Sequence, residues 1–563
     1  MRTQTQKKKD LLASDCIEIN GDKISIDEIV LIANNKCELK LTGDKKIIDK
    51  INESHHFIQK LSIENKAIYG VNTGFGGMAK HILSHEETQT LQDNLIYFLK
   101  TGTGEYLPDK YVRGAMIILC NALIKGASGI RFAIIERYVF FLNNNIVPRV
   151  HELGSIGASG DLVPLSYIAG AITEKGECFK VLHNNIEKSG ESICNEYNLE
   201  PIQLQPKEGL ALVNSTAMLT AIAACNLKEL KTLFALTLQV HAMMLQSLIA
   251  STQPFEDFIH QQKPHEGQIF IAKTVRHLLK GSSLVRKNDE LIAGESRLYQ
   301  DRYSIRCIPQ FLGPVADGIK TINKQIEIEA NSVTDNPLID MDNFQLIHGG
   351  NFLGEYIAIA MDQIRQYVGL ISKHLDAQIA MLVMPEFNSG LPSSLTGNST
   401  NQINMGLKGL QITANSIMPM LLFYGNSIAD KFPTHAEQFN QNINSQGFNS
   451  ALLTAKSIDL FRKYISISLI FAVQAVDLRV RKMDQDFIVE EHLSPETYKV
   501  YKAIMQICGK PENGKYPFVF NDNDHPLDDY IKRIEKDIND NGLLEEACAD
   551  ILINVEHFIR KSE

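Results

Sequence analysis

The chain carries, at residues 154–165, the stretch Gly154-Ser155-Ile156-Gly157-Ala158-Ser159-Gly160-Asp161-Leu162-Val163-Pro164-Leu165. It places Ala158-Ser159-Gly160 between a glycine-rich turn and the predicted start of a helix. Because glycine lets the backbone curl tightly, the Gly160 nitrogen can attack the Ala158 carbonyl carbon. Loss of two water molecules, one of which contains the Ser159 hydroxyl, would leave an electrophilic methylidene-imidazolone ring. The alternative is a plain turn and N-cap before a helix, with Pro164 in its first turn.

Composition indicates a globular chain of several subdomains. Hydrophobic residues make up 44% and charged residues 22% of the 563 residues, and the formal net charge is -10. The negative charge argues against nucleic acid or an anionic membrane surface as a partner. Lys7-Lys8-Lys9 has no apolar segment behind it, and Tyr464–Val476 is too short to cross a bilayer. We therefore expect neither a secretory signal nor a membrane helix.

The cysteines bear on redox compartment and metal binding. Nine of them are scattered singly from Cys16 to Cys548, and none forms a Cys-x-x-Cys pair. This spacing favours reduced thiols over a disulfide framework or a zinc site. We expect a cytoplasmic protein with no bound metal.

Apolar spacing of three and four residues predicts a mainly α-helical fold after a small mixed N-terminal region. The helical pattern starts near Glu86 and includes predicted helices at Val112–Leu123 and Ile130–Leu142. We expect longer helices at Thr216–Ala250, Pro314–Ala330, Phe352–Val383 and Asn449–Val480. The last two are apolar on more than one face, which indicates burial from several sides and favours a homo-oligomeric bundle.

The same patterns divide the chain into four parts. A loose tail at 1–22 precedes an N-terminal domain at 23–213, which carries both Tyr69 and the Ala158-Ser159-Gly160 tripeptide. The central bundle of long helices occupies 214–485. A cap of smaller helices follows at 486–563.

Several other motifs combine residue types that bind or transform small molecules. A mobile glycine loop is predicted at Tyr69-Gly70-Val71-Asn72-Thr73-Gly74-Phe75-Gly76-Gly77, and no Gly-Lys-Ser/Thr follows it as a phosphate loop would require. The further motifs are Asn214-Ser215-Thr216, Gln300-Asp301-Arg302-Tyr303-Ser304-Ile305-Arg306-Cys307, Asn331-Ser332-Val333-Thr334-Asp335-Asn336-Pro337, Gly349-Gly350-Asn351-Phe352, Asn404-Met405-Gly406-Leu407-Lys408-Gly409 and His435-Ala436-Glu437-Gln438-Phe439-Asn440-Gln441. Taken alone, each has an ordinary explanation: Asn214 would cap the long helix, Phe352 would be core and Lys408 would be a surface residue. The His-x-Glu of the last motif lacks the Pro-Cys-x-x-Cys partner of zinc deaminases.

Taken together, the motifs resemble the signature of the aromatic amino-acid ammonia-lyases, which act on phenylalanine, tyrosine or histidine. The likeness spans Tyr69 to about Arg479 and is strongest to bacterial, cyanobacterial-type phenylalanine ammonia-lyases, including Phe432-Pro433-Thr434-His435-Ala436-Glu437-Gln438-Phe439. The resemblance implies a fumarase/aspartase-like helical architecture and a homotetramer whose active sites draw on several chains. It also implies a 4-methylidene-imidazole-5-one formed autocatalytically from Ala158-Ser159-Gly160, with no metal and no dissociable coenzyme.

The resemblance assigns roles to single residues. Tyr69 would be the catalytic base, and Tyr303 would lie near the ring or the substrate amine. Asn214 would contact the ring, although Ser215 stands where the family usually has glycine. The other substrate-site residues, which would hold the carboxylate, the amine or the side chain, are Gln300, Arg306, Asn336, Phe352, Lys408, Glu437 and Asn440.

A tyrosine base requires a suitable electrostatic environment. A phenol has an ordinary pKa near 10, so Tyr69 needs positive potential around it. Helix N-termini supply such potential. Asp161, Asn214 and Gly313-Pro314 look like helix starts, and we expect these ends to converge on the site.

Substrate choice is predicted from Phe98-Leu99. Members of the family that act on tyrosine commonly have histidine at the first of these positions, where it hydrogen-bonds the phenol. A tyrosine hydroxyl buried against Phe98 would lose its water partners at a cost of about 1–3 kcal/mol. The resemblance therefore favours conversion of L-phenylalanine to trans-cinnamate and ammonia. The alternatives are a phenylalanine 2,3-aminomutase, which Glu437 disfavours by resemblance, a tyrosine or histidine ammonia-lyase, and an inactive helical scaffold that binds a small aromatic acid.

Overall fold

The computed structural model describes residues 16–63, 67–78, 82–286, 300–398, 400–431, 435–484, 486–524 and 526–561. Residues 1–15 of the expected tail and Phe432-Pro433-Thr434 lie outside the described residues. The described part is mainly helical, with small two- and three-stranded sheets. The predicted fold class is confirmed.

The chain forms two compact units, each of which is discontinuous in sequence. Unit 1 comprises Met1–Lys228, Lys324–Asp362 and Ser427–Leu453. Unit 2 comprises Glu229–Asn323, Gln363–Asn426 and Thr454–Glu563. Four of the five boundaries fall inside the long helices α10 (Ala217–Ser247), α14 (Ile308–Ala330), α15 (Glu355–Val383) and α17 (Gly447–Met483), and the fifth lies between Asn426 and Ser427. The division into four parts stays a prediction.

Unit 1 combines short helices with small sheets. Its helices are α2 (Ile26–Ala33), α3 (Lys45–Ile63), η1 (Gly76–Met78), α4 (His85–Phe98), α5 (Asp109–Leu123), α6 (Phe132–Asn143), α7 (Leu162–Ile172), α8 (Gly190–Tyr197) and α9 (Glu208–Val213). Its strands are β1 (Cys16–Ile19), β2 (Glu38–Leu41), β3 (Thr103–Tyr106), β4 (Val147–Pro148), β5 (His151–Leu153), β6 (Lys180–His183), β7 (Ile186–Ser189), β8 (Leu338–Asp340) and β9 (Gln345–Ile347). Strands β1 and β2 pair in parallel, whereas β3–β5, β4–β6–β7 and β8–β9 are antiparallel. Strand β1 thus occupies residues expected to belong to the tail.

The local sequence explains where the helices of unit 1 begin. Ser84 caps α4 and forms a capping box with Glu87, so the helical pattern predicted near Glu86 starts at His85. Helices α5 and α6 match the predicted helices at Val112–Leu123 and Ile130–Leu142. Residues 111–123 of α5 are all buried, because this helix lies in the core of the unit.

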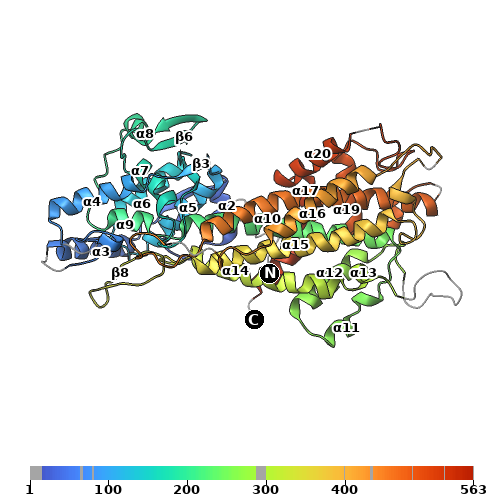
Figure 1. Ribbon diagram of the computed structural model, residues 1–563, viewed down its shortest axis with the longest axis horizontal. Coiled ribbons are helices and arrows are strands. Elements are labelled where there is room, and N and C mark those ends of the chain that lie inside the picture. The colour runs from blue at the N-terminus through green and yellow to red at the C-terminus, as the bar shows by residue number, and fades with distance from the viewer. Residues whose placement is uncertain are drawn as a thin grey trace. The chain divides into compact units, whose positions relative to one another are not determined.

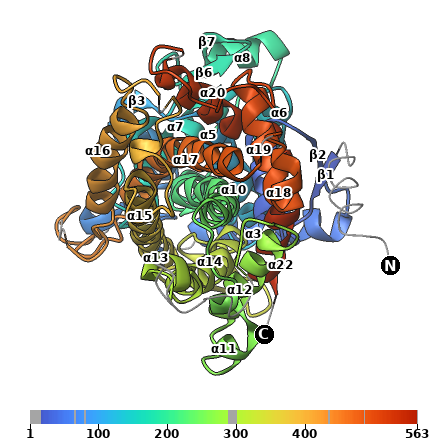
Figure 2. The same cartoon turned by 90° about the vertical axis from the view of Figure 1, so that its right-hand side faces the viewer.

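Unit 2 is a bundle of long helices. It contains parts of α10, α14, α15 and α17, together with η2 (Gln253–Phe255), α11 (Asp257–Gln261), α12 (Glu266–Leu279), α13 (Tyr303–Arg306), η3 (Ser393–Leu395), α16 (Lys408–Tyr424), α18 (Val489–His492), α19 (Pro495–Ile507), α20 (Leu527–Asn539), α21 (Leu543–Ala547) and α22 (Ala549–Arg560). Helix α10 runs among the long helices in Figure 1 and is seen end-on between α14, α15 and α17 in Figure 2. Two buried polar contacts fix it there, Lys231 to Asn323 and His241 to Gln378, both at 2.7 Å, and a partly buried ion pair joins Arg462 to Glu229 at 2.6 Å.

Helix α10 is the most deeply buried element. It contains neither glycine nor proline, and all its residues except Lys228 and Glu229 are buried. Among the described residues, Glu208–Ser247 is long and apolar enough to cross a membrane by composition, and its most apolar window is entirely buried within the protein. Its apolar character therefore serves the core.

The predicted start of α14 at Pro314 is wrong. The helix begins at Ile308 and includes Pro314. Ile308, Leu312 and Val315 are fully buried and share one helical face, so packing extends the helix across the proline. The other long helices differ from the predicted bounds by three residues or fewer at each end.

Candidate active site

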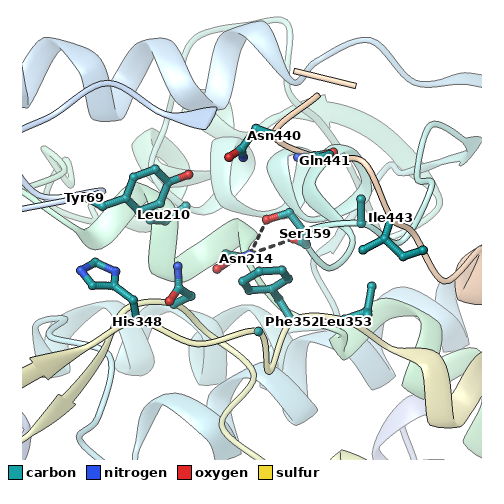
Figure 3. Close-up of a pocket in the computed structure, with 13 residues that line it drawn as sticks. Tyr69, Ser159, Leu210, Asn214, His348, Phe352, Leu353, Asn440, Gln441 and Ile443 are labelled. Carbon is teal, nitrogen blue, oxygen red and sulfur yellow. Dashed lines mark hydrogen bonds between the residues drawn. The ribbon is translucent and has the colours of Figure 1, made fainter. Parts of the chain in front are cut away.

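A cavity of about 450 Å³ lies within unit 1 (Figure 3). Its walls come from segments far apart in the sequence and include seven of the predicted site residues. The lining residues are Tyr69, Ala158, Ser159, Leu210, Asn214, Asn336, His348, Gly350, Phe352, Leu353, Asn440, Gln441 and Ile443. The fold thus assembles one concave site from motifs that the sequence presents separately.

The tripeptide Ala158-Ser159-Gly160 is packed tightly against the start of α10. Gly160 has φ +67°, a left-handed conformation that favours glycine, and a Cβ at this position would overlap the main chain of Ser215. The amide of Asp161 donates to the Ser215 carbonyl at 2.8 Å. A side chain at position 160 would therefore push the tripeptide out of place.

Asp161 precedes α7, as predicted, but its side chain stabilises a different helix. Its carboxylate accepts hydrogen bonds from the Leu219 amide and the Ser155 hydroxyl, both at 2.8 Å. It therefore satisfies an amide in the first turn of α10. Complete burial raises the pKa of Asp161 to about 7, although both hydrogen bonds act to lower it.

Asn214 binds the tripeptide directly. Its amide nitrogen donates to the Ser159 carbonyl oxygen at 2.8 Å and to Ser159 Oγ at 2.9 Å (Figure 3). The prediction that Asn214 starts the long helix is wrong, because Asn214 follows the end of α9 and α10 begins at Ala217. The amide is engaged with Ser159, so the capping explanation is wrong as well.

Helix N-termini do meet beside the tripeptide. Helices α7 and α10 both begin next to it. On the other side, the amides of Ser445 and Gln446, just before α17, donate to the carbonyls of Gly157 and Ile156 at 3.2 and 3.1 Å. These ends supply positive partial charge to the tripeptide wall. The third predicted start, Gly313-Pro314, is internal to α14 and belongs to unit 2.

Tyr69 projects its phenol into the cavity from the glycine loop. The phenol oxygen accepts a hydrogen bond from the Gly76 amide at 3.1 Å, and the ring lies edge-on to His348 with centroids 6.2 Å apart. Burial raises the pKa of Tyr69, the Gly76 hydrogen bond lowers it, and the nearby Glu437 carboxylate raises it. The net direction is upward, so these residues alone do not create the low pKa expected of a base.

Glu437 lies beside the Tyr69 loop. A Cβ at Gly76 would overlap its carboxylate, which places the two chain segments in direct contact. Glu437, Gln438 and Phe439 all have positive φ, and the amides of Ala436 and Gln441 each donate to the other's carbonyl. Burial raises the pKa of Glu437, against hydrogen bonds from Gln441 and Asn440 that lower it.

Asn336 is one of the polar residues that line the cavity. Its carboxamide oxygen accepts from the Gly349 amide at 2.8 Å, so its nitrogen is the group that can donate to a substrate carboxylate. The preceding Asp335 forms a fully buried ion pair with Lys207. This pair anchors the segment that carries Asn336.

A family model for aromatic amino acid lyases matches residues 24–506. The chain belongs to this lyase family. The lyase is 49% identical to the phenylalanine ammonia-lyase of Nostoc punctiforme over 550 residues. The aligned region covers 97% of this chain and 96% of that enzyme. It is 38% identical over 549 residues to an aromatic ammonia-lyase of Loktanella atrilutea, with 96% and 99% covered. The solved structure of a phenylalanine aminomutase from Pantoea agglomerans matches with a TM-score of 0.83 at 29% identity, with 93% and 98% covered.

The family membership makes the protein an aromatic ammonia-lyase, a carbon–nitrogen lyase. Its cavity includes residues that sequence reasoning missed. These are Leu210, His348, Gly350, Leu353, Gln441 and Ile443. His348 directly precedes the Gly349–Phe352 motif, Gly350 lies within it and Gln441 ends the His435 motif, so their place in or beside these motifs could have identified them. Leu210 gave no signal, because it reads as an ordinary apolar residue of α9.

Besides Gly160, three predicted residues of unit 1 lie outside the described lining of the lyase cavity. Phe98 ends α4 and is 52% exposed, whereas Leu99 is buried as the C-cap of that helix. Glu437 is also outside the lining, although it contacts the glycine loop. The selectivity role of Phe98-Leu99 stays a prediction.

The remaining predicted residues belong to unit 2. Gln300 and Arg306 line a second cavity of about 450 Å³, together with Asp301, Cys307 and Gln310. The guanidinium of Arg306 lies 4.8 Å from the ring of Tyr303, which is 72% exposed. Lys408 is exposed at the first residue of α16. The described lining of the unit 1 cavity includes none of these four residues.

Proposed function

We propose that the lyase converts L-phenylalanine to trans-cinnamate and ammonia. The observation that carries this proposal is the Asn214 amide, which holds both oxygens of Ser159 at the wall of the cavity that contains the Tyr69 phenol. The 49% identity to the Nostoc phenylalanine ammonia-lyase supports phenylalanine as the substrate.

The residues around the tripeptide fit the formation of a methylidene-imidazolone. Asn214 donates to the Ser159 carbonyl oxygen, which the ring would retain, and to Ser159 Oγ, which ring formation expels as water. Position 160 accepts only glycine, whose nitrogen must reach the Ala158 carbonyl carbon. Once formed, the ring supplies an electrophile that makes ammonia a better leaving group.

Tyr69 removes a proton from the β-carbon of the substrate. Its phenol oxygen accepts from the Gly76 amide, and this hydrogen bond stabilises the phenolate form. The glycine loop closes over the substrate and excludes water. Glu437 and Asn440 face the departing amine, and burial raises the pKa of Glu437, which favours its carboxyl group as a proton-exchanging group.

Two residues bind the substrate carboxylate. Asn336 donates its amide from the wall of the cavity. Arg306 provides the planar, charged fork that pairs with a carboxylate, and we infer that it comes from another copy of the chain. Helix α16 exposes the apolar residues Ile412, Met420, Leu422 and Phe423, which supports assembly into the homotetramer implied by the family.

The apolar part of the cavity receives the phenyl ring. Leu210, Phe352, Leu353 and Ile443 provide an apolar wall for it. The proposal that Phe98 disfavours the hydroxyl of tyrosine rests on the family resemblance, because Phe98 is 52% exposed and lies outside the described lining of the cavity. Since the nine cysteines are all free thiols, we infer that the enzyme acts in the cytoplasm.

The test combines product analysis with intact mass. Purified enzyme is incubated with L-phenylalanine, L-tyrosine and L-histidine, and the unsaturated acid is followed by ultraviolet absorbance. We expect cinnamate as the main product and a chain lighter by two water molecules. Ser159→Ala should abolish both signals, whereas the control Ser62→Ala on α3 should keep both.

Each other outcome overturns a defined part of the proposal. β-Phenylalanine as the main product would make the protein an aminomutase. Faster turnover of tyrosine or histidine would reject phenylalanine as the substrate. An active chain of unaltered mass would reject the ring, and a folded, inactive chain of unaltered mass would indicate a scaffold.

A further inference from the structure

We propose that the hydroxyl of Ser215 is a positioning group that ties the tripeptide wall of the cavity to the wall that carries Asn336. The inference rests on the proposed function, because it assigns Asn336 to the substrate carboxylate and Ser159 to the reacting centre.

The main chain of Ser215 is locked to the tripeptide. Its carbonyl accepts from the Asp161 amide at 2.8 Å, and its backbone leaves no room for a side chain at Gly160. The neighbouring Asn214 donates to both oxygens of Ser159. Any shift of residues 214 and 215 therefore moves the tripeptide wall.

The Ser215 side chain extends in the opposite direction, to Thr334. The two hydroxyl oxygens lie 2.8 Å apart, and both residues are buried, with 3% and 5% of their surface exposed. Ser215 Oγ also accepts from the Ala217 amide at 3.2 Å, and Thr334 Oγ1 accepts from the Thr216 amide at 3.3 Å. The hydroxyl pair thus caps the start of α10 and connects it to the 334–336 segment.

Thr334 lies two residues before Asn336 in a segment with little freedom. Asp335 is paired with Lys207, and Asn336 is held by the Gly349 amide. A continuous series of hydrogen bonds therefore leads from Ser159 through Asn214 and Ser215 to Thr334 and the Asn336 segment. With glycine at position 215, this connection would lack its central hydrogen bond.

The bridge sets the distance between the reacting centre and the carboxylate donor. Substrate binding requires both ends to fit at once, and a looser spacing weakens the carboxylate contact before it affects the chemical step. Loss of one buried neutral hydrogen bond corresponds to about a three- to tenfold change in an equilibrium constant. We expect this change in KM.

The test is a double-mutant cycle in the full-length enzyme. Ser215→Ala, Ser215→Gly and Thr334→Val should each raise KM for L-phenylalanine about three- to tenfold, while kcat changes less than about twofold. Ser215→Ala combined with Thr334→Val should raise KM by less than the product of the two single effects, because both remove the Ser215–Thr334 bond, although each also removes a different amide contact. Thr334→Ser keeps the hydroxyl and should retain the original KM. The control Ser166→Ala removes a buried hydroxyl of α7 that bonds only its own helix, at the Val163 carbonyl, and should leave KM unchanged.

Three results would overturn the inference: an unchanged KM, additive effects in the double variant, or a fall in kcat and melting temperature that Ser166→Ala reproduces. Intact mass checks that each variant still loses two water molecules. If the unmodified enzyme releases no unsaturated acid, the proposed function fails separately. The same cycle is then measured by calorimetric binding of L-phenylalanine in a Tyr69→Phe background, where equal affinities across the cycle would overturn the inference.

Discussion

The cavity of unit 1 and the 300–307 segment of unit 2 present their functional residues in different ways. In unit 1, Tyr69, Ser159 and Asn214 come from separate segments and are held in a cavity by hydrogen bonds to the surrounding chain. In unit 2, Gln300, Tyr303 and Arg306 come from one short segment. Tyr303 is largely exposed, whereas Asn214 is 2% exposed.

The two regions also differ in whether their polar side-chain atoms have hydrogen-bond partners. Asn214 donates to two oxygens of Ser159. Within the described part of the chain, the buried Nε of Arg306 has no hydrogen-bond partner. A buried donor without a partner is uncommon, because it loses its hydrogen bonds to water without replacing them. The contrast supports the proposed pairing of Arg306 with a substrate carboxylate, because Asn214 is engaged with Ser159 whereas Arg306 keeps an unpaired donor.

The largest effect is expected when the proposed base is removed from the cavity of unit 1. Tyr69→Phe should lower kcat by roughly 10²- to 10⁴-fold, because the β-proton loses its acceptor. The intact mass should still show the loss of two waters, since Tyr69 contacts Gly76 rather than the tripeptide. Tyr197→Phe on α8 is the control and should retain full activity. Near-normal turnover by Tyr69→Phe would show that another group in the cavity is the base.

A smaller effect is expected from the unit 2 segment, and it tests whether the segment serves a different chain. Arg306→Ala should raise KM for L-phenylalanine by roughly 10²-fold through loss of the charged pair. Co-expression of Arg306→Ala chains with Tyr69→Phe chains should restore part of the activity. Mixed oligomers would then contain sites with an intact tyrosine from one chain and an intact arginine from another. No restoration in verified mixed oligomers would mean that both residues must come from the same chain.

The sequence predicted the helical fold and seven of the residues that line the unit 1 cavity, because both depend on local patterns. Apolar periodicity located α10, α15 and α17 to within three residues, and the glycine-rich motif located the tripeptide. The start of α14 was mispredicted because burial of Ile308 and Leu312 outweighs the local preference of Pro314. Asn214 was ambiguous because capping and tripeptide binding require the same side chain, and only the position of Ser159 distinguishes them. Leu210 enters the cavity through long-range packing, which a single sequence does not encode in any local pattern.

Closure of the glycine loop should be sensitive to a single methyl group. Gly76 has φ +55°, and a Cβ there would overlap the Glu437 carboxylate, so Gly76→Ala must displace either the Tyr69 loop or the 437–439 turn. We expect about a tenfold fall in kcat/KM, with the loss of two waters retained. Gly43→Ala is the matched control, because no atom lies within 4 Å of a Cβ at that position. Equal activity of the two variants would show that the contact between the loop and Glu437 does not matter for turnover.

The smallest expected effect is on the pH dependence of stability, where one buried carboxyl group from each unit can be compared. Burial raises the pKa of Asp161 in unit 1 from 3.8 to about 7, and that of Asp477 in unit 2 from 3.8 to about 6, where the Arg481 guanidinium opposes the shift. A raised pKa means that the folded protein binds the proton more tightly than the unfolded chain. The resulting stabilisation is therefore complete below about pH 4 and declines as the pH rises to the folded pKa, by about 1.4 kcal/mol for each pH unit.

The two carboxyl groups should therefore separate in their pH dependence. The melting temperature of the unsubstituted protein should fall as the pH rises. Asp161→Asn should make this fall less steep up to about pH 7, whereas Asp477→Asn should do so only up to about pH 6. The difference arises because Asp161 receives two neutral hydrogen bonds and no cation, whereas Asp477 is partly compensated by Arg481. Thermal unfolding measured from pH 5 to pH 8 checks both. If the melting temperatures of the two variants depend on pH in the same way, the Arg481 guanidinium does not make the pKa of Asp477 different from that of Asp161.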